Sequence, residues 1–196
     1  ATRALLERDD VIIVASISCI YGLGNPADFS ELSIQFRKGE KISRNEIIRK
    51  LVDMQYERSD NFLENGKFRV RGDTIDIIPV YSNNIIRIEL DGGIVSLITE
   101  LDRLTNKVIS KIDDIKIFPA KQYVVPKEKH IGALNSIRAE LEEHLPSLGL
   151  LEAERLKKRV NYDLEMIKEL GYCSGIENYS RHFDGREPGK PPYVLL

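Results

Sequence analysis

Two short segments near the middle of the chain, 67–71 and 85–90, alternate charged with apolar residues. The charged positions that stand out are Arg69, Arg71, Arg87 and Glu89. Successive side chains of a strand point to opposite faces, so each pair should lie on one face. Two interpretations remain open: solvated charges that also blunt sheet edges, or a docking surface on which arginine pairs with carboxylates of a partner.

A second group of polar residues lies near the end of the chain, where Tyr179, Arg181 and His182 precede a loop rich in Gly and Pro. Aromatic rings and guanidinium groups together suit single-stranded nucleic acid. Between Glu177 and Lys190, however, three basic residues are balanced by three acidic ones. A structural loop is therefore the other interpretation.

The segment Gly22–Ala27 formally matches the dinucleotide fingerprint G-x-G-x-x-A. Four residues separate it from the preceding apolar run, and no second parallel strand ending in an acid follows, so an ordinary turn is favoured. A dinucleotide-binding enzyme domain is kept as the alternative. The sequence contains no phosphate loop of the G-x-x-x-x-G-K-[ST] type and no paired nucleophile and base. We therefore expect no catalytic, cofactor-binding or metal-binding residues.

The elements that must position these residues differ along the chain. A short helical segment is followed by the β-branched run 11–17, which predicts a parallel strand covered on both faces. Residues 32–118 alternate with period two after one helix, which predicts an α+β unit with a mainly antiparallel sheet. Beyond Pro126 the spacing of apolar residues becomes helical, with breaks at Pro146 and Gly149. This predicts an antiparallel helical hairpin that ends at Gly171.

Composition limits the class of protein. The chain has 196 residues and a net charge of -2, from 29 basic and 31 acidic residues, which argues against indiscriminate binding of nucleic acid. Cys19 and Cys173 are isolated and suit a reducing, cytoplasmic location. No apolar run is long enough for a membrane span, and we expect no membrane partner. The first residue is Ala1 and the last residues are apolar, so we expect an internal segment of a longer chain.

Four segments resemble signatures of the UvrB family and follow in that family's order. They are VASISCIYGLG (14–24), FRVRGD (68–73), YDLEM (162–166) and GYCSGIENYSRH (171–182). The last is specific to UvrB. The hairpin type at 68–73 also occurs in the transcription-repair coupling factor, which is the alternative relative. Asn106 stands where the family has Gly, a change that Asn can serve because it tolerates the left-handed conformation.

The resemblance implies an α/β fold. Residues 1–31 and 119–196 would belong to an incomplete first RecA-like motor domain, with a parallel sheet and the helical hairpin. Residues 32–118 would form an inserted, mainly antiparallel α+β domain that binds UvrA. ATP and Mg²⁺ would be bound by other parts of the parent protein, a helicase-like ATPase subunit of an excision nuclease.

The resemblance also implies roles for individual residues. The residues expected to contact UvrA are Arg58, Arg69, Arg71, Arg87 and Glu89. Candidate residues of the DNA track are Ser16, Ser18, Tyr179 and Arg181. The expected function is that of a binding module in bacterial nucleotide excision repair. It would load the helicase-like subunit onto damaged DNA, with the incision nuclease UvrC as a further partner of the parent protein.

Overall fold

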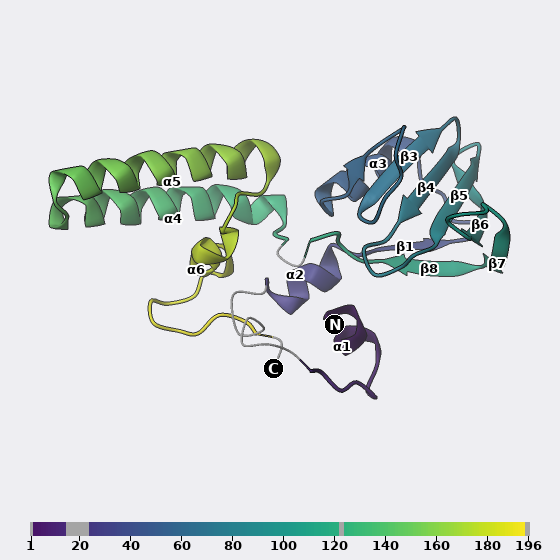
Figure 1. The fold of residues 1–196 in the computed structure, drawn as a ribbon, viewed down its shortest axis with the longest axis horizontal. Helices are drawn as coiled ribbons and strands as arrows, with labels where there is room; N and C mark the ends of the chain where they lie inside the picture. Colours follow the sequence, from purple (N-terminus) through teal and green to yellow (C-terminus); the bar gives the residue numbers. More distant parts are fainter. Residues whose placement is uncertain (1, 15–23, 122–123, 195–196) are drawn as a thin grey trace. The chain divides into compact units, whose positions relative to one another are not determined.

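A computed structural model of the chain describes residues 2–14, 24–121 and 124–194 (Figure 1). The chain divides into two compact units, one formed by Ser30–Lys121 and the other by Ala1–Phe29 together with Gln122–Leu196. The first unit consists mainly of strands and the second mainly of helices.

The strand-rich unit contains a six-stranded sheet in the order β2-β3-β4-β5-β6-β7, and a smaller sheet in which β1 pairs with β8. The strands are β1 (Ile34–Arg37), β2 (Glu57–Arg58), β3 (Lys67–Arg71), β4 (Thr74–Ile78), β5 (Ile85–Asp91), β6 (Ile94–Leu101), β7 (Val108–Ile112) and β8 (Asp114–Ile117). All pairs are antiparallel except the short pair β2–β3. The prediction of a mainly antiparallel sheet is confirmed.

Tight turns set the register of the two central hairpins. In the β3–β4 hairpin Arg71 pairs with Thr74, so only two residues form the turn. In the β5–β6 hairpin the turn is formed by Gly92 and Gly93, with φ of 58° and 82°. Two-residue turns of this left-handed type match the twist of antiparallel strands. Both predicted hairpins are confirmed, and Asn106 adopts the left-handed conformation expected for it, with φ of 55°.

The main core of this unit lies between one face of the sheet and helix α3 (Arg44–Asp53). The helix begins at Ser43, whose hydroxyl accepts a hydrogen bond from the Glu46 amide at 3.2 Å. Ile47 and Leu51 are fully buried against apolar sheet residues, as predicted. Val52 is 49% exposed, so its expected inward position is wrong. Each helical residue turns about 100° from the one before, which carries Val52 past the buried stripe.

The helical unit is built around a hairpin of α4 (Lys127–His144) and α5 (Leu150–Leu170), which lie side by side (Figure 1). The connection contains the 3-10 turn η2 (Leu145–Ser147), and Gly171 ends α5 with φ of 71°. The predicted hairpin is confirmed. Ile131 and Leu150, expected to face inward, are 71% and 83% exposed and are exceptions near helix ends.

Two short elements follow the hairpin, η3 (Ile176–Tyr179) and α6 (Ser180–Asp184). Cys173, Ile176 and Phe183 are buried in the same core as the apolar residues of α4 and α5. This packing brings the polar residues around Tyr179 onto the hairpin.

The start of the chain contains α1 (Thr2–Glu7) and α2 (Pro26–Glu31), and Pro26 opens α2 as expected. The predicted buried strand at 11–17 is wrong for its described part. Residues 11–14 form no strand, and Ile12 and Val14 are 92% and 96% exposed. A strand covered on both faces needs neighbouring strands, and none in the described parts of the chain pairs with 11–14. The one parallel pair there, β2–β3, belongs to the other unit.

No helix within the described residues is both long enough and apolar enough to cross a membrane.

Candidate functional site

The candidate site lies on the sheet face opposite the main core of the strand-rich unit. Register pairing aligns one row of residues across five strands, and the row is Arg69, Asp76, Arg87, Thr99 and Lys111. A second row beside it consists of Arg71, Thr74, Glu89 and Leu97. The four charged residues singled out from the alternation therefore lie on one face of one sheet.

A buried carboxylate organises the first row. Asp76 is 2% exposed and accepts hydrogen bonds from both neighbouring arginines. Arg87 donates through Nε to Oδ1 at 2.7 Å and through Nη2 to Oδ2 at 3.0 Å. Arg69 donates through Nε to Oδ2 at 2.9 Å. Two guanidinium groups are thus held by one acid, which fixes their positions on the sheet.

The electrostatics agree with this geometry. Burial by itself raises the pKa of Asp76, but the hydrogen bonds and charges of Arg87 and Arg69 outweigh it, and the pKa falls below the ordinary value of 3.8. The hydrogen bond with Asp76 raises the pKa of Arg87 in turn. Asp76 and Arg87 are therefore both charged at neutral pH.

The second row is more open to solvent. Arg71 is exposed and, among the described residues, forms no ion pair, whereas Glu89 is half-buried beside Arg87. Arg71 can present its guanidinium to a partner without breaking an ion pair with any of the described residues. Lys111, at the far end of the first row, is also exposed. The face therefore combines fixed arginines with cations that are available to a partner.

Arg58 is placed differently from the other four residues. It lies on the edge strand β2 in register with Phe68, a core residue, so its row belongs to the opposite face of the sheet. Its nearest charged partner is Asp60, at 3.3 Å. The structure does not bring Arg58 together with the other four.

The sequence interpretation missed Asp76, which sits at the centre of the site. A signal was present, because Asp76 interrupts the apolar residues of β4 at a position facing Arg69 once the hairpin register is fixed. The pairing of β4 with β5 was also needed to place Arg87 on the other side of the acid.

The helical unit contains a second polar cluster, around Tyr179 and Arg181. The Tyr179 hydroxyl donates a hydrogen bond of 2.7 Å to Asp163 of α5, which is 7% exposed. Burial raises the pKa of Tyr179, and the bond to Asp163 adds to the shift. Burial likewise raises the pKa of the Cys173 thiol to about 11, followed by the effects of Asp163 and Glu177. This thiol is protonated at neutral pH and has little nucleophilic character.

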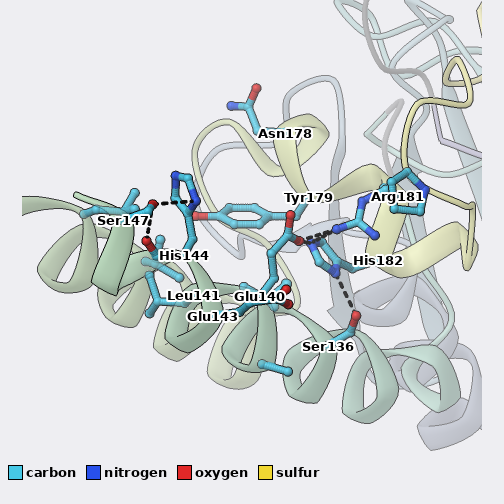
Figure 2. A pocket seen from close by; sticks show the side chains of 15 residues that line it. Ser136, Glu140, Leu141, Glu143, His144, Ser147, Asn178, Tyr179, Arg181 and His182 are labelled. Atoms are coloured by element: carbon cyan, nitrogen blue, oxygen red, sulfur yellow. Dashed lines mark hydrogen bonds and ion pairs between the residues drawn. The ribbon is translucent and has the colours of Figure 1, made fainter. Parts of the chain in front are cut away.

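Arg181 and His182 both contact Glu140 of α4 (Figure 2). Arg181 forms an ion pair with Glu140, and His182 Nε2 lies 2.8 Å from the same carboxylate. The other ring nitrogen of His182 lies 2.9 Å from the Ser136 hydroxyl. Burial lowers the pKa of His182, and the charge of Arg181 lowers it further against the opposing effect of Glu140. The polar groups of Tyr179 and Arg181 therefore already have partners within the unit.

Several predicted residues lie outside the described parts of the chain. Ser16 and Ser18 are among them, as are Gly22 and Leu23 of the dinucleotide fingerprint. The described part of that motif caps α2, because the Asn25 side chain accepts a hydrogen bond from the Ala27 amide at 2.9 Å. In the described ranges, no group of three or more His, Cys, Asp or Glu residues is arranged to hold a metal ion.

Comparison with known proteins identifies both units. A model described as the UvrB interaction domain matches residues 34–123, and a model described as the UvrB third helical domain matches residues 128–185. The first match covers the sheet that carries the charged rows, and the second covers α4, α5 and α6.

Curated relatives extend the match over the whole chain. UvrABC system protein B of Methanosarcina acetivorans is 55% identical over 196 residues, covering 100% of this chain and 29% of the relative. Its counterpart in Caldanaerobacter subterraneus subsp. tengcongensis is 55% identical over 201 residues, again covering 100% of this chain and 30% of the relative. The chain belongs to the UvrB family. It spans less than a third of the length of these relatives.

Proposed function

We propose that the strand-rich unit is the module through which a UvrB protein docks on UvrA in nucleotide excision repair. The description of the matching model as an interaction domain supports a docking role, and the relatives' name, UvrABC system protein B, supports UvrA as the partner.

The observation that carries the proposal is the row formed by Arg69, Asp76 and Arg87. Asp76 holds two arginines in place before any partner arrives, so less side-chain entropy is lost on binding. Guanidinium groups that keep spare N–H donors suit carboxylates on the opposite surface. With Arg71 beside this row, the face is suited to an acidic, hydrogen-bonding patch of UvrA.

The roles of the longer parent protein are part of the proposal. Residues 1–31 and 119–196 would belong to its first RecA-like motor domain, which with ATP and Mg²⁺ bound elsewhere would verify the lesion. Damaged DNA and the nuclease UvrC would be partners of that whole protein, in the cytoplasm. Ser16, Ser18, Tyr179 and Arg181 remain the candidate residues of the DNA track.

A charge reversal at Arg71 is the sharpest test. Arg71 is exposed and has no ion pair to break among the described residues, so Arg71→Glu changes the face without disturbing the core. If Arg71 pairs with a desolvated acid of UvrA, the free energy of binding, measured by calorimetry, should become weaker by about 2 to 5 kcal/mol. Arg69→Glu is a poorer probe, because it would place a second carboxylate beside the buried Asp76.

The matched control is Arg49→Glu, on the exposed side of α3 in the same unit. This substitution makes the same change of charge, but away from the two rows. The free energy of binding to UvrA should stay within about 0.5 kcal/mol of that of the unmodified chain. Equal losses in both variants would point to a nonspecific effect of net charge. An unchanged affinity in Arg71→Glu would remove this face from the interface.

A further inference from the structure

The charged sheet face continues into a third, apolar row, on the side of the first row that lies away from the second. Its members are Ile78, Ile85 and Leu101, each two residues along its strand from a member of the first row and therefore on the same face. They are at most 3% exposed and form a small core of their own, separate from the main core. Since they lie on the face away from α3, another part of the chain must cover them.

The cover is the segment 59–66 between β2 and β3, here called the covering segment. Its Leu63 packs on the third row. The side-chain amide of Asn65 donates a hydrogen bond of 2.7 Å to the Ser82 carbonyl. Arg103, just after β6, donates to the Asn65 side chain at 3.1 Å and to the Leu63 carbonyl at 3.5 Å. The covering segment is therefore fastened to the sheet by both apolar and polar contacts.

Phe62 of the covering segment takes no part in this cover. Its side chain is 75% exposed, although its amide donates to the Ser59 hydroxyl at 3.3 Å and so holds the backbone of the turn. Leu104, the neighbour of Arg103, is 90% exposed. Single apolar residues at a surface are common, so exposure alone indicates nothing. Here, however, a fastened segment presents an aromatic ring to solvent directly beside the charged rows.

The charges around Phe62 resemble the surroundings of a buried interface centre. Asp60 and Glu64, two residues before and after the ring, form ion pairs with Arg58 at 3.3 Å and with Lys67 at 3.0 Å. An apolar centre with a polar rim is the usual composition of an interface. The covering segment also begins directly after Arg58, the predicted contact that lies apart from the other four. A partner that touches both Arg58 and the charged rows would cover Phe62.

We propose that Phe62 is the aromatic anchor of the docking surface and enters an apolar pocket of UvrA, next to the acidic patch that receives the arginines. A few buried aromatic residues often carry most of the binding free energy of an interface, whereas charged residues mainly set its orientation and the rate of association. The ring is held in place before binding, so little conformational entropy is lost. This inference rests on the proposed docking to UvrA and adds the residue that dominates it.

The test measures binding of the whole 196-residue chain to purified UvrA by calorimetry. Phe62→Ala should raise the dissociation constant by about 30-fold, the size expected for an aromatic hot spot. Phe62→Leu keeps part of the apolar area and should lose less. Because the side chain of Phe62 is 75% exposed, the urea midpoint of both variants should match that of the unmodified chain. A loss of affinity would then not result from unfolding.

Salt separates the anchor from the charged rows. The loss caused by Phe62→Ala should be the same at low and high salt, because burial of an apolar ring is not screened. The loss caused by Arg71→Glu should shrink at high salt, because the charges it alters are screened. A loss in Phe62→Ala that disappears at high salt would contradict an apolar anchor.

Val52→Ala is the matched control. Val52 is 49% exposed on α3, which packs on the opposite face of the sheet, and its loss should leave the affinity unchanged. If Arg71→Glu weakens binding and Phe62→Ala does not, the anchor is wrong while the docking face stands. If neither variant changes the affinity, both the anchor and the docking face are wrong. If Val52→Ala weakens binding as much as Phe62→Ala, the effect is not specific to the covering segment and the anchor is again wrong.

Discussion

Asp76 on β4 and Arg87 on β5 face each other in register and are joined by two hydrogen bonds, of 2.7 and 3.0 Å. The same carboxylate also accepts from Arg69 on β3. The arginines proposed to dock a partner are therefore also part of what holds three strands of the sheet together. Substitutions at these positions change folding and binding at once, so the two effects must be measured separately.

Replacing the central acid tests the structural part of this relationship. Asp76→Asn removes the charge that two arginines share but nearly preserves the shape of the side chain. We expect the free energy of unfolding of the strand-rich unit to fall by about 2 to 3 kcal/mol, measured by urea denaturation. The loss should be below that of a fully buried pair, because the side chains of Arg69 and Arg87 are 17% and 31% exposed and can turn toward water.

The control is Asp73→Asn in the turn of the β3–β4 hairpin. Asp73 is exposed, so the same chemical change there should cost less than about 0.5 kcal/mol. If both variants unfold at the same urea concentration, the hydrogen bonds to Asp76 contribute no net stability.

The lowered pKa of Asp76 predicts how stability depends on pH. A carboxyl group whose pKa is lower in the folded than in the unfolded state contributes stability that is fully present above its unfolded value. That contribution is lost as the pH falls from about the ordinary value of 3.8 through the lowered folded pKa. The melting temperature of the unmodified chain should therefore fall steeply as the pH is lowered below about 4. In Asp76→Asn this part of the dependence should be missing, and parallel curves for the two proteins would contradict the assignment.

The sequence predicts part of the charged sheet face, but not its central residue. Alternation alone placed Arg69 with Arg71, and Arg87 with Glu89, because side-chain direction in a strand has a period of two. The same rule could not place Asp76 between two of them, since that depends on which strands pair and in which register. Arg58 shows the limit most clearly, because its face is set by a two-residue parallel edge pairing that leaves no periodic signal.

The helical unit was predicted more completely than the start of the chain. Apolar residues spaced by three and four in α4 and α5, with Gly171 at the end, depend on local geometry that repeats within each helix. The run at 11–14 has strand composition but no strand beside it in the described residues, and composition cannot supply the missing hydrogen-bonding partners. The sequence pattern does not predict this polar cluster, because His182 joins Ser136 and Glu140, which are neighbours on α4, only when α6 packs on that helix.

The C-terminal end of α3 provides a test of backbone strain. Gln55 follows the last helical turn with φ of 64°, and the amides of Gln55 and Tyr56 donate back to Val52 and Leu51, both at 2.9 Å. This termination favours glycine at the left-handed position. Gln55→Gly should raise the free energy of unfolding by about 0.5 to 1 kcal/mol, the strain released less the added flexibility of the unfolded chain. Gln55→Ala keeps the Cβ and should give no increase, so equal stabilisation by Ala and Gly would contradict the role of φ.

The bond between Tyr179 and Asp163 predicts the behaviour of the helical unit. Tyr179→Phe keeps the ring in the core but removes the hydroxyl that donates to the Asp163 carboxylate, which is 7% exposed. Leaving a buried acceptor without its donor should cost about 1 to 3 kcal/mol, measured as a shift in the urea midpoint of helical circular dichroism. Tyr162→Phe is the matched control, because Tyr162 is 62% exposed on the same helix α5 and should unfold like the unmodified chain. If the urea midpoint of Tyr179→Phe is also unchanged, water replaces the phenol at Asp163, and packing alone holds the ring in place.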